Sequence, residues 1–231
     1  MLKTTDDIAN QIFSSFPVSL QKRLHASTKQ LDLPAGKTLF STQETINYLY
    51  FPMDCLIHLI YEVDDGDEIQ IACLGDNDIC GDAIFMGHKK SPMRAQVLLS
   101  GEALVLPAKE ALYWFNNERE FREPILKASG RINQQMMQKV ACYRFHNIHQ
   151  QLCCWLLEAT NRFSVSVLDV THEHIANLLG VRREGVSEAA HKLQLEGVID
   201  YKRGHIKILN RKRLEQLTCE CYNVLKQLKN L

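Results

Sequence analysis

Five polar side chains share the outward positions of one predicted helix in the segment VTHEHIANLLGVRREGVSEAAHKL, residues 170–193. They are Arg182, Arg183, Glu184, Ser187 and Glu188. In the major groove of DNA, guanidinium groups donate paired hydrogen bonds to guanine, and carboxylates accept hydrogen bonds from cytosine. A helix lying in that groove would bring these five side chains to the base edges. The segment therefore predicts sequence-specific recognition of double-stranded DNA by residues 182–193.

The apolar residues of the same segment have the spacing of a helix-turn-helix. Small Ala176 lets two helices approach closely, and Gly180 can take the positive φ that the turn between them needs. The positions that would lock the helices together are all apolar: Ile175, Leu179, Val181, Val186 and Ala189. Thr171 can cap the first helix, whose start suits a phosphate group. We therefore expect Thr171 and His172 to contact the DNA backbone.

A short hairpin is predicted directly after this segment, within LQLEGVIDYKRGHIKIL, residues 193–209. Such a hairpin is the wing of a winged helix-turn-helix, and Lys202 and Arg203 at its tip would contact the DNA backbone. The alternative is an interaction module in which the helix-turn-helix is vestigial and contacts no DNA. That alternative accounts for the apolar positions but gives no reason for arginines at the start of the second helix.

Residues 31–108 have the pattern of β structure. Runs rich in β-branched and aromatic residues, such as INYLYF and CLIHLIYEV, alternate with turn sequences such as PAG and DDGD. Many short strands at this spacing favour a sandwich or barrel over a parallel sheet. The period then becomes helical. We expect a β-domain over residues 1–120, a long helix over 121–147 and a DNA-binding domain over 148–231.

One apolar stripe defines the long helix. Its members lie three or four residues apart: Ile125, Ala128, Ile132, Met136, Val140 and Tyr143. A long helix between two domains suits a seam between two copies of the chain, so we expect a homodimer through this stripe. The alternative is that the stripe packs on the β-domain of its own chain.

The order of these elements resembles the Crp/Fnr family of bacterial transcription regulators, over about residues 31–225. The resemblance implies an α+β fold of two domains. These are an N-terminal antiparallel β-roll, like the cyclic-nucleotide-binding jelly roll, and a C-terminal winged helix-turn-helix, with a long dimerisation helix between them. It also implies a homodimer that binds a pseudo-palindromic operator, with RNA polymerase as a further partner.

Within the run GVRREGVSEAA, the resemblance assigns roles to single residues. The family's base-contacting arginine and glutamate fall on Arg183 and Glu184, and its phosphate-contacting threonine falls on Thr171. Two positions depart from the family pattern: Arg182 replaces the usual Ser/Thr cap, and Glu188 replaces a third arginine. The family's half-site sequence is therefore not transferred to this chain.

The predicted β-roll carries a changed version of a ligand pocket within residues 80–97. In relatives that bind cyclic AMP, a glycine–glutamate pair and an Arg-Ser/Thr-Ala run hold the ribose and the cyclic phosphate. The corresponding residues here are Gly81, Asp82, Arg94, Ala95 and Gln96. The shorter carboxylate and the missing hydroxyl remove a ribose contact and a phosphate donor, so we expect that cyclic AMP is not the signal. The alternatives are a cyclic-AMP-responsive activator, a different small anion on Arg94, or a structural pair between Arg94 and Asp82.

The eight cysteines are predicted to be reduced, mostly buried thiols. None forms a C-x-x-C pair, the spacing that zinc and iron–sulfur sites favour. On a helix, Cys219 and Cys221 would point to nearly opposite sides. The sequence therefore predicts no metal site and no resident cofactor; the alternative is haem sensing by a histidine such as His58 or His88.

The charge distribution and the missing motifs narrow the class of protein. The formal net charge is zero, yet the part from Ile148 onward has 12 Lys+Arg against 9 Asp+Glu. No apolar run approaches the roughly 20 residues that cross a bilayer, and the N-terminus lacks a secretory pattern. We find no nucleophile elbow, P-loop or zinc-protease motif. We expect a cytoplasmic DNA-binding protein that is not an enzyme and has no membrane partner.

Overall fold

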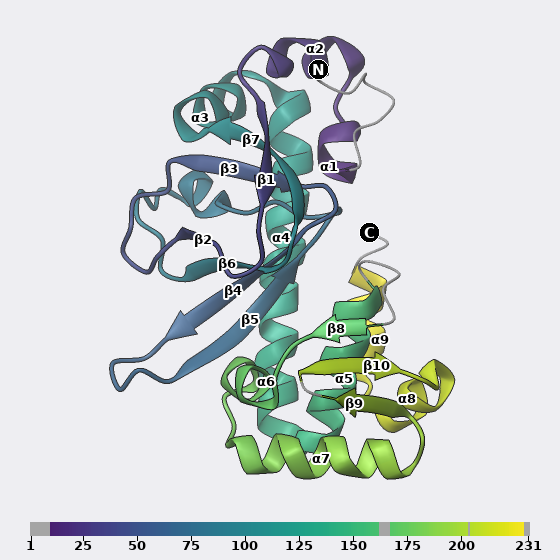
Figure 1. The fold of residues 1–231 in the computed structure, drawn as a ribbon. Coiled ribbons are helices and arrows are strands. Elements are labelled where there is room, and N and C mark those ends of the chain that lie inside the picture. The colour runs from purple at the N-terminus through teal and green to yellow at the C-terminus, as the bar shows by residue number, and fades with distance from the viewer. Residues whose placement is uncertain (1–9, 162–166, 203, 229–231) are drawn as a thin grey trace. The chain divides into compact units, whose positions relative to one another are not determined.

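Two sheets of short antiparallel strands form the N-terminal part of the chain (Figure 1). The structure is a computed structural model that describes residues 10–161, 167–202 and 204–228. One sheet has the strand order β1-β7-β3 and the other β2-β6-β4-β5. The strands are β1 (Lys29–Leu33), β2 (Thr38–Phe40), β3 (Tyr48–Pro52), β4 (Leu56–Glu62), β5 (Glu68–Leu74), β6 (Arg94–Leu99) and β7 (Gly101–Pro107). The predicted antiparallel β-domain is therefore confirmed.

Aromatic rings join the short N-terminal helices to this β-domain. Phe13 meets Phe51 edge-on with ring centroids 5.4 Å apart, and Phe16 stacks on Phe121 at 5.1 Å. Such pairs add to the stabilisation from burial of their apolar surface. The helical elements here are α1 (Gln11–Ser14), α2 (Val18–His25), the 3-10 helix η2 (Asp82–Met86) and α3 (Ala108–Asn117). The apolar core thus continues from the sheets into the helices beside them.

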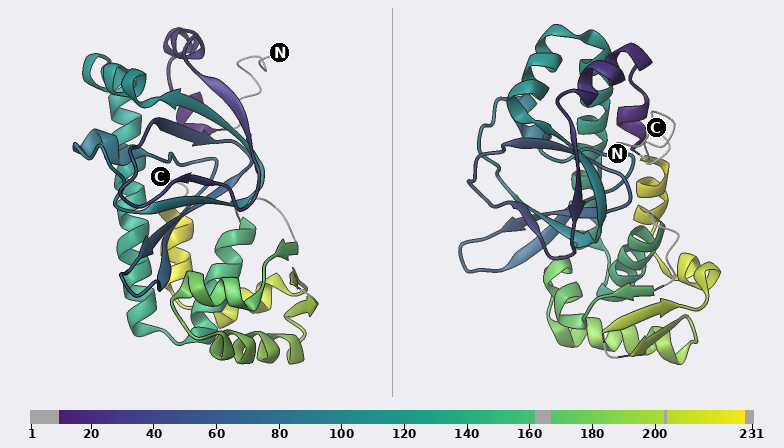
Figure 2. Two further views of the ribbon diagram at one scale, coloured as in Figure 1. Left: turned by 60° about the vertical axis from the view of Figure 1, so that its left-hand side comes forward. Right: turned by 45° about the horizontal axis from the view of Figure 1, so that its top comes forward.

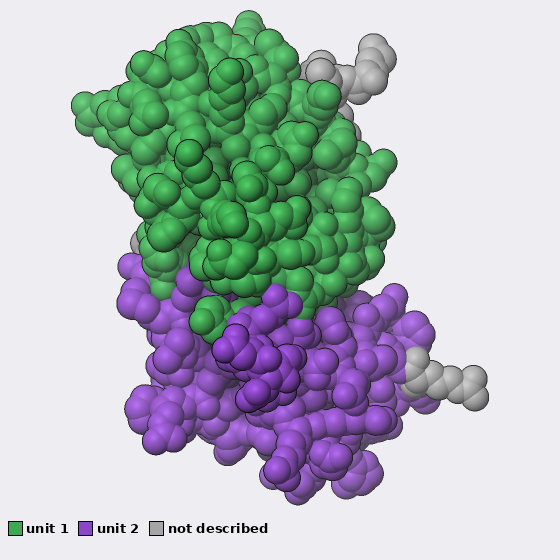
Figure 3. Space-filling model, turned by 90° about the vertical axis from the view of Figure 1, so that its left-hand side faces the viewer, with its two compact units in different colours: residues 1–61, 72–133 green, residues 62–71, 134–231 purple. Residues whose placement is uncertain are grey.

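Helix α4 (Arg119–Phe145) belongs to both of the compact units into which the chain divides (Figure 3). Unit 1 comprises residues 1–61 and 72–133, and unit 2 comprises residues 62–71 and 134–231. The division falls inside α4, whereas the sequence pattern placed the domain boundaries near the two ends of this helix. Neither α4 nor any other helix in the described ranges is long and apolar enough to cross a membrane.

The first half of the predicted dimer stripe packs on its own chain. Ile125, Ala128 and Ile132 are at most 1% exposed within a single chain, so these side chains cannot meet a partner. A dimer seam through these three residues is therefore wrong, because the core of unit 1 already covers that face of α4. Val140, the fifth member of the stripe, is 65% exposed. Burial, rather than apolar spacing, distinguishes the two faces of this helix.

Unit 2 contains the C-terminal helices and a three-stranded sheet of order β8-β10-β9 (Figures 1 and 2). The elements are α5 (Ile148–Asn161), β8 (Val167–Asp169), α6 (His172–Leu179), α7 (Arg183–Leu195), β9 (Ile199–Lys202), β10 (His205–Ile208), α8 (Arg211–Leu217) and α9 (Cys221–Leu228). Residues 62–71 join this unit through Gln70. Its carbonyl accepts a hydrogen bond from the Tyr143 hydroxyl at 2.6 Å, and its side chain accepts one from Trp155 Nε1 at 3.0 Å.

A buried ion pair joins α4 to α5 within unit 2. Lys139 Nζ donates a hydrogen bond to Glu158 Oε2, and the two side chains are 3% and 6% exposed. Burial by itself would lower the pKa of Lys139, but the Glu158 carboxylate raises that pKa well above its ordinary value. Each charge therefore depends on the other to remain in the interior.

We expect Lys139→Met to lower the free energy of unfolding by about 3–5 kcal/mol, because it leaves the Glu158 carboxylate buried without a counter-charge. The double variant Lys139→Met/Glu158→Leu should recover most of this loss, because neither charge then remains in the interior. Urea denaturation followed by circular dichroism would measure both changes. Equal losses in the single and double variants would contradict the interdependence of the two charges.

Candidate nucleic-acid interface

Helices α6 and α7 form a closely packed pair joined by Gly180. This residue has φ 63° and ψ 38°, a left-handed conformation that glycine adopts without steric cost. Ala176 is 1% exposed between the helices, as its small size allows. Four of the five positions expected to lock the pair are buried, namely Ile175, Leu179, Val186 and Ala189, and the fifth, Val181, is half-buried. The predicted helix-turn-helix is therefore confirmed.

Thr171 is the N-cap residue of α6. Its Oγ1 accepts a hydrogen bond from the backbone N–H of His174 at 3.1 Å, which satisfies one of the unpaired amides at the helix start. The remaining amides of that first turn, together with the exposed Thr171, form a surface that suits a phosphate oxygen. The capping role that the sequence predicts for Thr171 agrees with this geometry.

His172, which the sequence pattern predicts at the DNA backbone, is half-buried and contacts two other side chains. Its Nδ1 lies 3.1 Å from the Ser187 hydroxyl, and its ring stacks on Tyr201 with centroids 3.9 Å apart. Burial and the nearby Arg183 guanidinium lower the pKa of His172, which favours the neutral imidazole. His172 thus connects α7 to the wing strand β9. The Ser187 hydroxyl, predicted to contact bases, is engaged in this connection.

The charged side chains at the start of α7 are exposed to solvent. Arg182 is the N-cap residue, without a capping hydrogen bond from its side chain, and Arg183 is the first helical residue. Arg183 Nε lies 3.6 Å from Glu173 Oε2, in a pair whose side chains are 66% and 61% exposed and which contributes little to stability. Glu184 and Glu188 are exposed as well. This end of α7 therefore presents two positive and two negative side chains to solvent.

The hairpin of β9 and β10 forms the predicted wing. Lys202 and His205 are paired across the antiparallel ladder, and Gly204 has φ 88° in the turn between them. The Lys202 side chain is 79% exposed, with Nζ 3.2 Å from Asp200 Oδ2. Arg203, the other residue predicted at the tip, lies outside the described residues. The exposed ammonium group of Lys202 is available to a phosphate.

Two residues of the predicted effector pocket lie at the start of η2. Gly81 has φ 102°, and a Cβ built there would lie 2.6 Å from the Tyr48 carbonyl oxygen, so only glycine fits this position. Asp82 is the first residue of η2, and burial raises the pKa of its carboxyl group. This segment therefore has a fixed backbone and a carboxyl group shifted toward its neutral form.

The other three pocket residues follow one another along β6, and they face in two directions. Arg94 Nη1 donates to Gln96 Oε1 at 3.1 Å, and Gln96 Nε2 donates to the Gly36 carbonyl at 3.0 Å. Ala95, between them, is fully buried in the core. Successive strand residues point to opposite faces, so the Ala95 side chain is directed away from those of its two neighbours. The assignment of these residues to an effector pocket stays a prediction.

The structure brings together a group of side chains that the sequence pattern did not single out. Cys142 and His146 lie near the end of α4, Cys219 precedes α9, and Cys221 is the first residue of α9. Their ligand atoms all lie within 4.8 Å of one another. The expectation that Cys219 and Cys221 point apart on a helix is wrong, because the helix begins only at Cys221. The spacings Cys-x₃-His and Cys-x-Cys were the available signal.

Comparisons with known proteins assign both units to described domain types. Residues 30–118 match the model of the cyclic nucleotide-binding domain, and residues 150–217 match the model of the Crp-like helix-turn-helix domain. The chain is 26% identical, over 188 residues, to the CRP-like cAMP-activated global transcriptional regulator of Mycobacterium tuberculosis. That similarity covers 74% of this chain and 84% of the relative.

Solved structures share the fold. A transcriptional regulator of the Crp/Fnr family from Eubacterium rectale matches with a TM-score of 0.74 and 20% identity, over 90% of this chain and 97% of that one. FixK2 from Bradyrhizobium japonicum matches with a TM-score of 0.71 and 15% identity, over 83% of this chain and 98% of that one. The same combination of β-domain, long helix and helix-turn-helix therefore occurs in both proteins.

Proposed function

The chain belongs to the Crp/Fnr family of transcription regulators, and we propose that two copies of it bind a pseudo-palindromic DNA site through α7. In this arrangement α7 lies in the major groove, with its four exposed charged side chains at the base edges. Thr171 and Lys202 contact phosphates on either side of that groove, and such contacts fix position without specifying sequence. The half-sites then lie one helical turn apart, about 10 base pairs from centre to centre.

The exposure of Arg183 carries this proposal. Its described ion pair, with Glu173, is exposed at both ends and weak, so a base can replace that carboxylate at little cost. A guanidinium at the start of a recognition helix donates two hydrogen bonds to guanine O6 and N7. A helix-turn-helix that only packed against other proteins would gain nothing from an arginine in this position.

This role requires binding and no catalysis. The M. tuberculosis relative is named as a transcriptional regulator. Regulation of transcription makes RNA polymerase the further partner and the cytoplasm the compartment in which the protein acts. A protein bound to its operator can either recruit RNA polymerase or block it. The position of the operator relative to the promoter determines which of the two occurs.

We expect Arg183→Ala to weaken binding to the preferred site by about 1–3 kcal/mol and to relax the preference at one guanine in each half-site. Lys202→Ala is the matched comparison, since loss of a phosphate contact should weaken all sequences alike and flatten the salt dependence. Selection of bound sequences from a random pool, followed by titration at several salt concentrations, measures both effects. An unchanged selected sequence for Arg183→Ala would show that α7 does not read this base.

The exposed face of α4 supports self-association. Leu126, Met137 and Val140 are 52%, 64% and 65% exposed, and Gly130 and Asn133 lie on the same exposed face. These five positions alternate in steps of four and three residues, the spacing of a coiled-coil seam. Burial of large apolar side chains between two copies would stabilise a dimer, and the small Gly130 would allow close approach. We therefore propose that the dimer seam lies on this face and does not include Ile132.

We expect Met137→Asp to sediment as a monomer and to lose operator binding at the same time, because a charge in the seam has no partner. One half-site alone lacks the effective concentration that the linked second half-site provides. Met86→Asp is the control, since Met86 is 51% exposed on η2 and lies outside the proposed seam. A folded Met137→Asp monomer that bound the full operator with unchanged affinity would refute the requirement for a dimer.

We propose that the β-domain responds to a signal other than cyclic AMP. Arg94 is hydrogen-bonded to Gln96, whose amide in turn reaches the Gly36 carbonyl, so a cyclic phosphate would have to displace these contacts. Ala95 supplies no hydroxyl, and its side chain is in the core. An effector of any kind must bind one arrangement of the DNA-binding domains more tightly than another, since equal affinity for both shifts neither.

Calorimetric titration of the purified protein with cyclic AMP and cyclic GMP should give no binding at micromolar concentration and no change in operator affinity. The physical reason is that each polar group of the ligand buried without a hydrogen-bond partner costs about 1–3 kcal/mol. One such group on the ribose and one on the phosphate would together weaken binding by roughly a hundredfold or more. Micromolar binding of cyclic AMP that Arg94→Ala abolishes would instead assign the protein to the cyclic-nucleotide-responsive regulators.

A further inference from the structure

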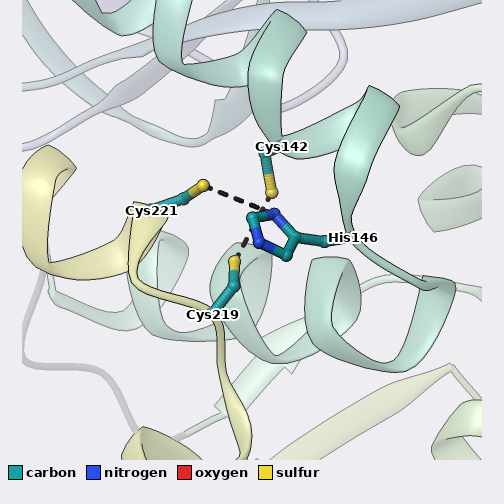
Figure 4. A group of neighbouring side chains, drawn as sticks. All are labelled: Cys142, His146, Cys219 and Cys221. Carbon is teal, nitrogen blue, oxygen red and sulfur yellow. Dashed lines mark hydrogen bonds between the residues drawn. The ribbon is translucent and has the colours of Figure 1, made fainter.

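Four potential metal ligands converge in unit 2, from two segments far apart in the chain (Figure 4). Cys142 is in the last turn of α4, and His146 directly follows the helix, with its backbone N–H donating to the Cys142 carbonyl at 3.1 Å. Cys219 and Cys221 lie before and at the start of α9. The Sγ atoms of Cys142 and Cys219 are 3.6 Å apart, and Cys221 Sγ lies 3.5 Å from His146 Nδ1.

These separations match the edges of a zinc coordination tetrahedron. Zinc bonds of about 2.3 Å to sulfur and about 2.0–2.1 Å to nitrogen hold two sulfurs about 3.8 Å apart, and a sulfur and a nitrogen about 3.6 Å apart. A disulfide would instead need sulfurs about 2.05 Å apart. All four ligand atoms lie within 4.8 Å of one another, so a single ion can reach them after small side-chain rotations.

Two of the four ligands, His146 and Cys221, have polar neighbours of the kind that commonly orient metal ligands. His146 Nε2 lies 3.3 Å from Glu220 Oε2, so a carboxylate can hold the imidazole with its other nitrogen directed at the thiols. This carboxylate–histidine arrangement fixes the ring and raises its basicity toward a metal. Gln138 Nε2 donates to Cys221 Sγ at 3.1 Å, which stabilises negative charge on that sulfur.

The site is enclosed and rich in sulfur. The three cysteines are at most 4% exposed, and the His146 side chain is 14% exposed. The Cys154 thiol on α5 interacts with those of Cys142 and Cys219, so a further thiol adjoins the four ligands. Soft thiolate ligands with one imidazole select zinc over magnesium or calcium, which prefer oxygen. A closed set of four protein ligands is typical of structural rather than catalytic zinc.

We propose that Cys142, His146, Cys219 and Cys221 bind one zinc ion in a tetrahedral Cys₃His site. The ion links the end of α4 to the start of α9, two segments separated by more than 70 residues, within the unit that carries α7. Binding therefore stabilises the folded form of unit 2, because the unfolded chain offers no assembled site. This inference is independent of the signal that the β-domain senses and of the DNA sequence that α7 contacts.

The test is metal analysis of the full-length protein kept in reducing buffer. After equilibration with Zn²⁺ and dialysis against a competing chelator, mass spectrometry should find about one zinc per chain, as four protein ligands imply. Titration of the metal-free protein with Co²⁺ should give the intense visible bands of tetrahedral cobalt–thiolate coordination. Retention of no zinc, or cobalt bands typical of octahedral oxygen ligands, would overturn the proposal.

Variants separate this donor set from other thiols. Cys219→Ser and His146→Gln should each abolish stoichiometric zinc and the cobalt bands, while Cys55→Ser, a buried cysteine of unit 1, should change neither. Glu220→Gln should leave the stoichiometry intact and weaken zinc affinity by about 10–100-fold. Circular dichroism establishes folding, and if Cys219→Ser fails to fold, the half-buried His146→Gln decides. Loss of zinc in Cys154→Ser but not in His146→Gln, or a Cys142–Cys219 disulfide without metal, would refute the assigned ligands.

Discussion

Helix α4 has to accommodate two apolar faces, and the rest of the molecule depends on how it does so. A helix of 27 residues turns every 3.6 residues, so side chains at different spacings emerge on different sides. Ile125 and Ile132 are covered by unit 1, whereas Leu126 and Met137 are left at the surface. The uncovered face is therefore the one that a second copy would cover.

The second half of α4 also organises the DNA-binding unit. Lys139 pairs with Glu158 on α5, and Tyr143 donates to the backbone of residue 70, whose side chain accepts from Trp155. The thiol and imidazole groups at the end of the helix meet the start of α9. Polar contacts of this kind are directional, so they fix the orientation of packed helices more strictly than apolar contacts alone. Helix α4 is thus joined to α5 and to the start of α9, and α5 in turn packs on α7.

Around α7, the structure separates residues that maintain geometry from residues that remain free. Thr171 caps α6, and His172 connects Ser187 on α7 to Tyr201 on the wing strand. Among the described residues, Arg183 forms an exposed ion pair with Glu173. The engaged side chains set the angle between the helices and the wing, and the free side chains can exchange water for DNA. The proposed DNA contact therefore involves fewer side chains than the sequence pattern suggested, because His172 and Ser187 are engaged with each other.

The sequence by itself determined the structural features that depend on residues close together along the chain. The cap at Thr171, the left-handed turn at Gly180 and the apolar spacing of α6 and α7 are local requirements, so they were predictable residue by residue. The antiparallel β-domain followed from strand and turn patterns for the same reason. Local patterns, however, do not show which face of a helix the rest of the protein covers. Ile132 and Met137 are both apolar residues of α4, and only tertiary packing decided that one is buried and the other exposed.

The cysteine group shows the same limit in its chemistry. Cys142 and His146 have the spacing of a helix face, but a pair of ligands does not make a metal site. Cys219 and Cys221 have a spacing that would separate them on a helix, and the break after α8 places Cys219 outside α9. Tertiary structure brought the two pairs together across more than 70 residues. Coordination requires the ligand atoms to be close together in space. The separation of two residues along the sequence does not determine how far apart their side chains lie in the folded chain.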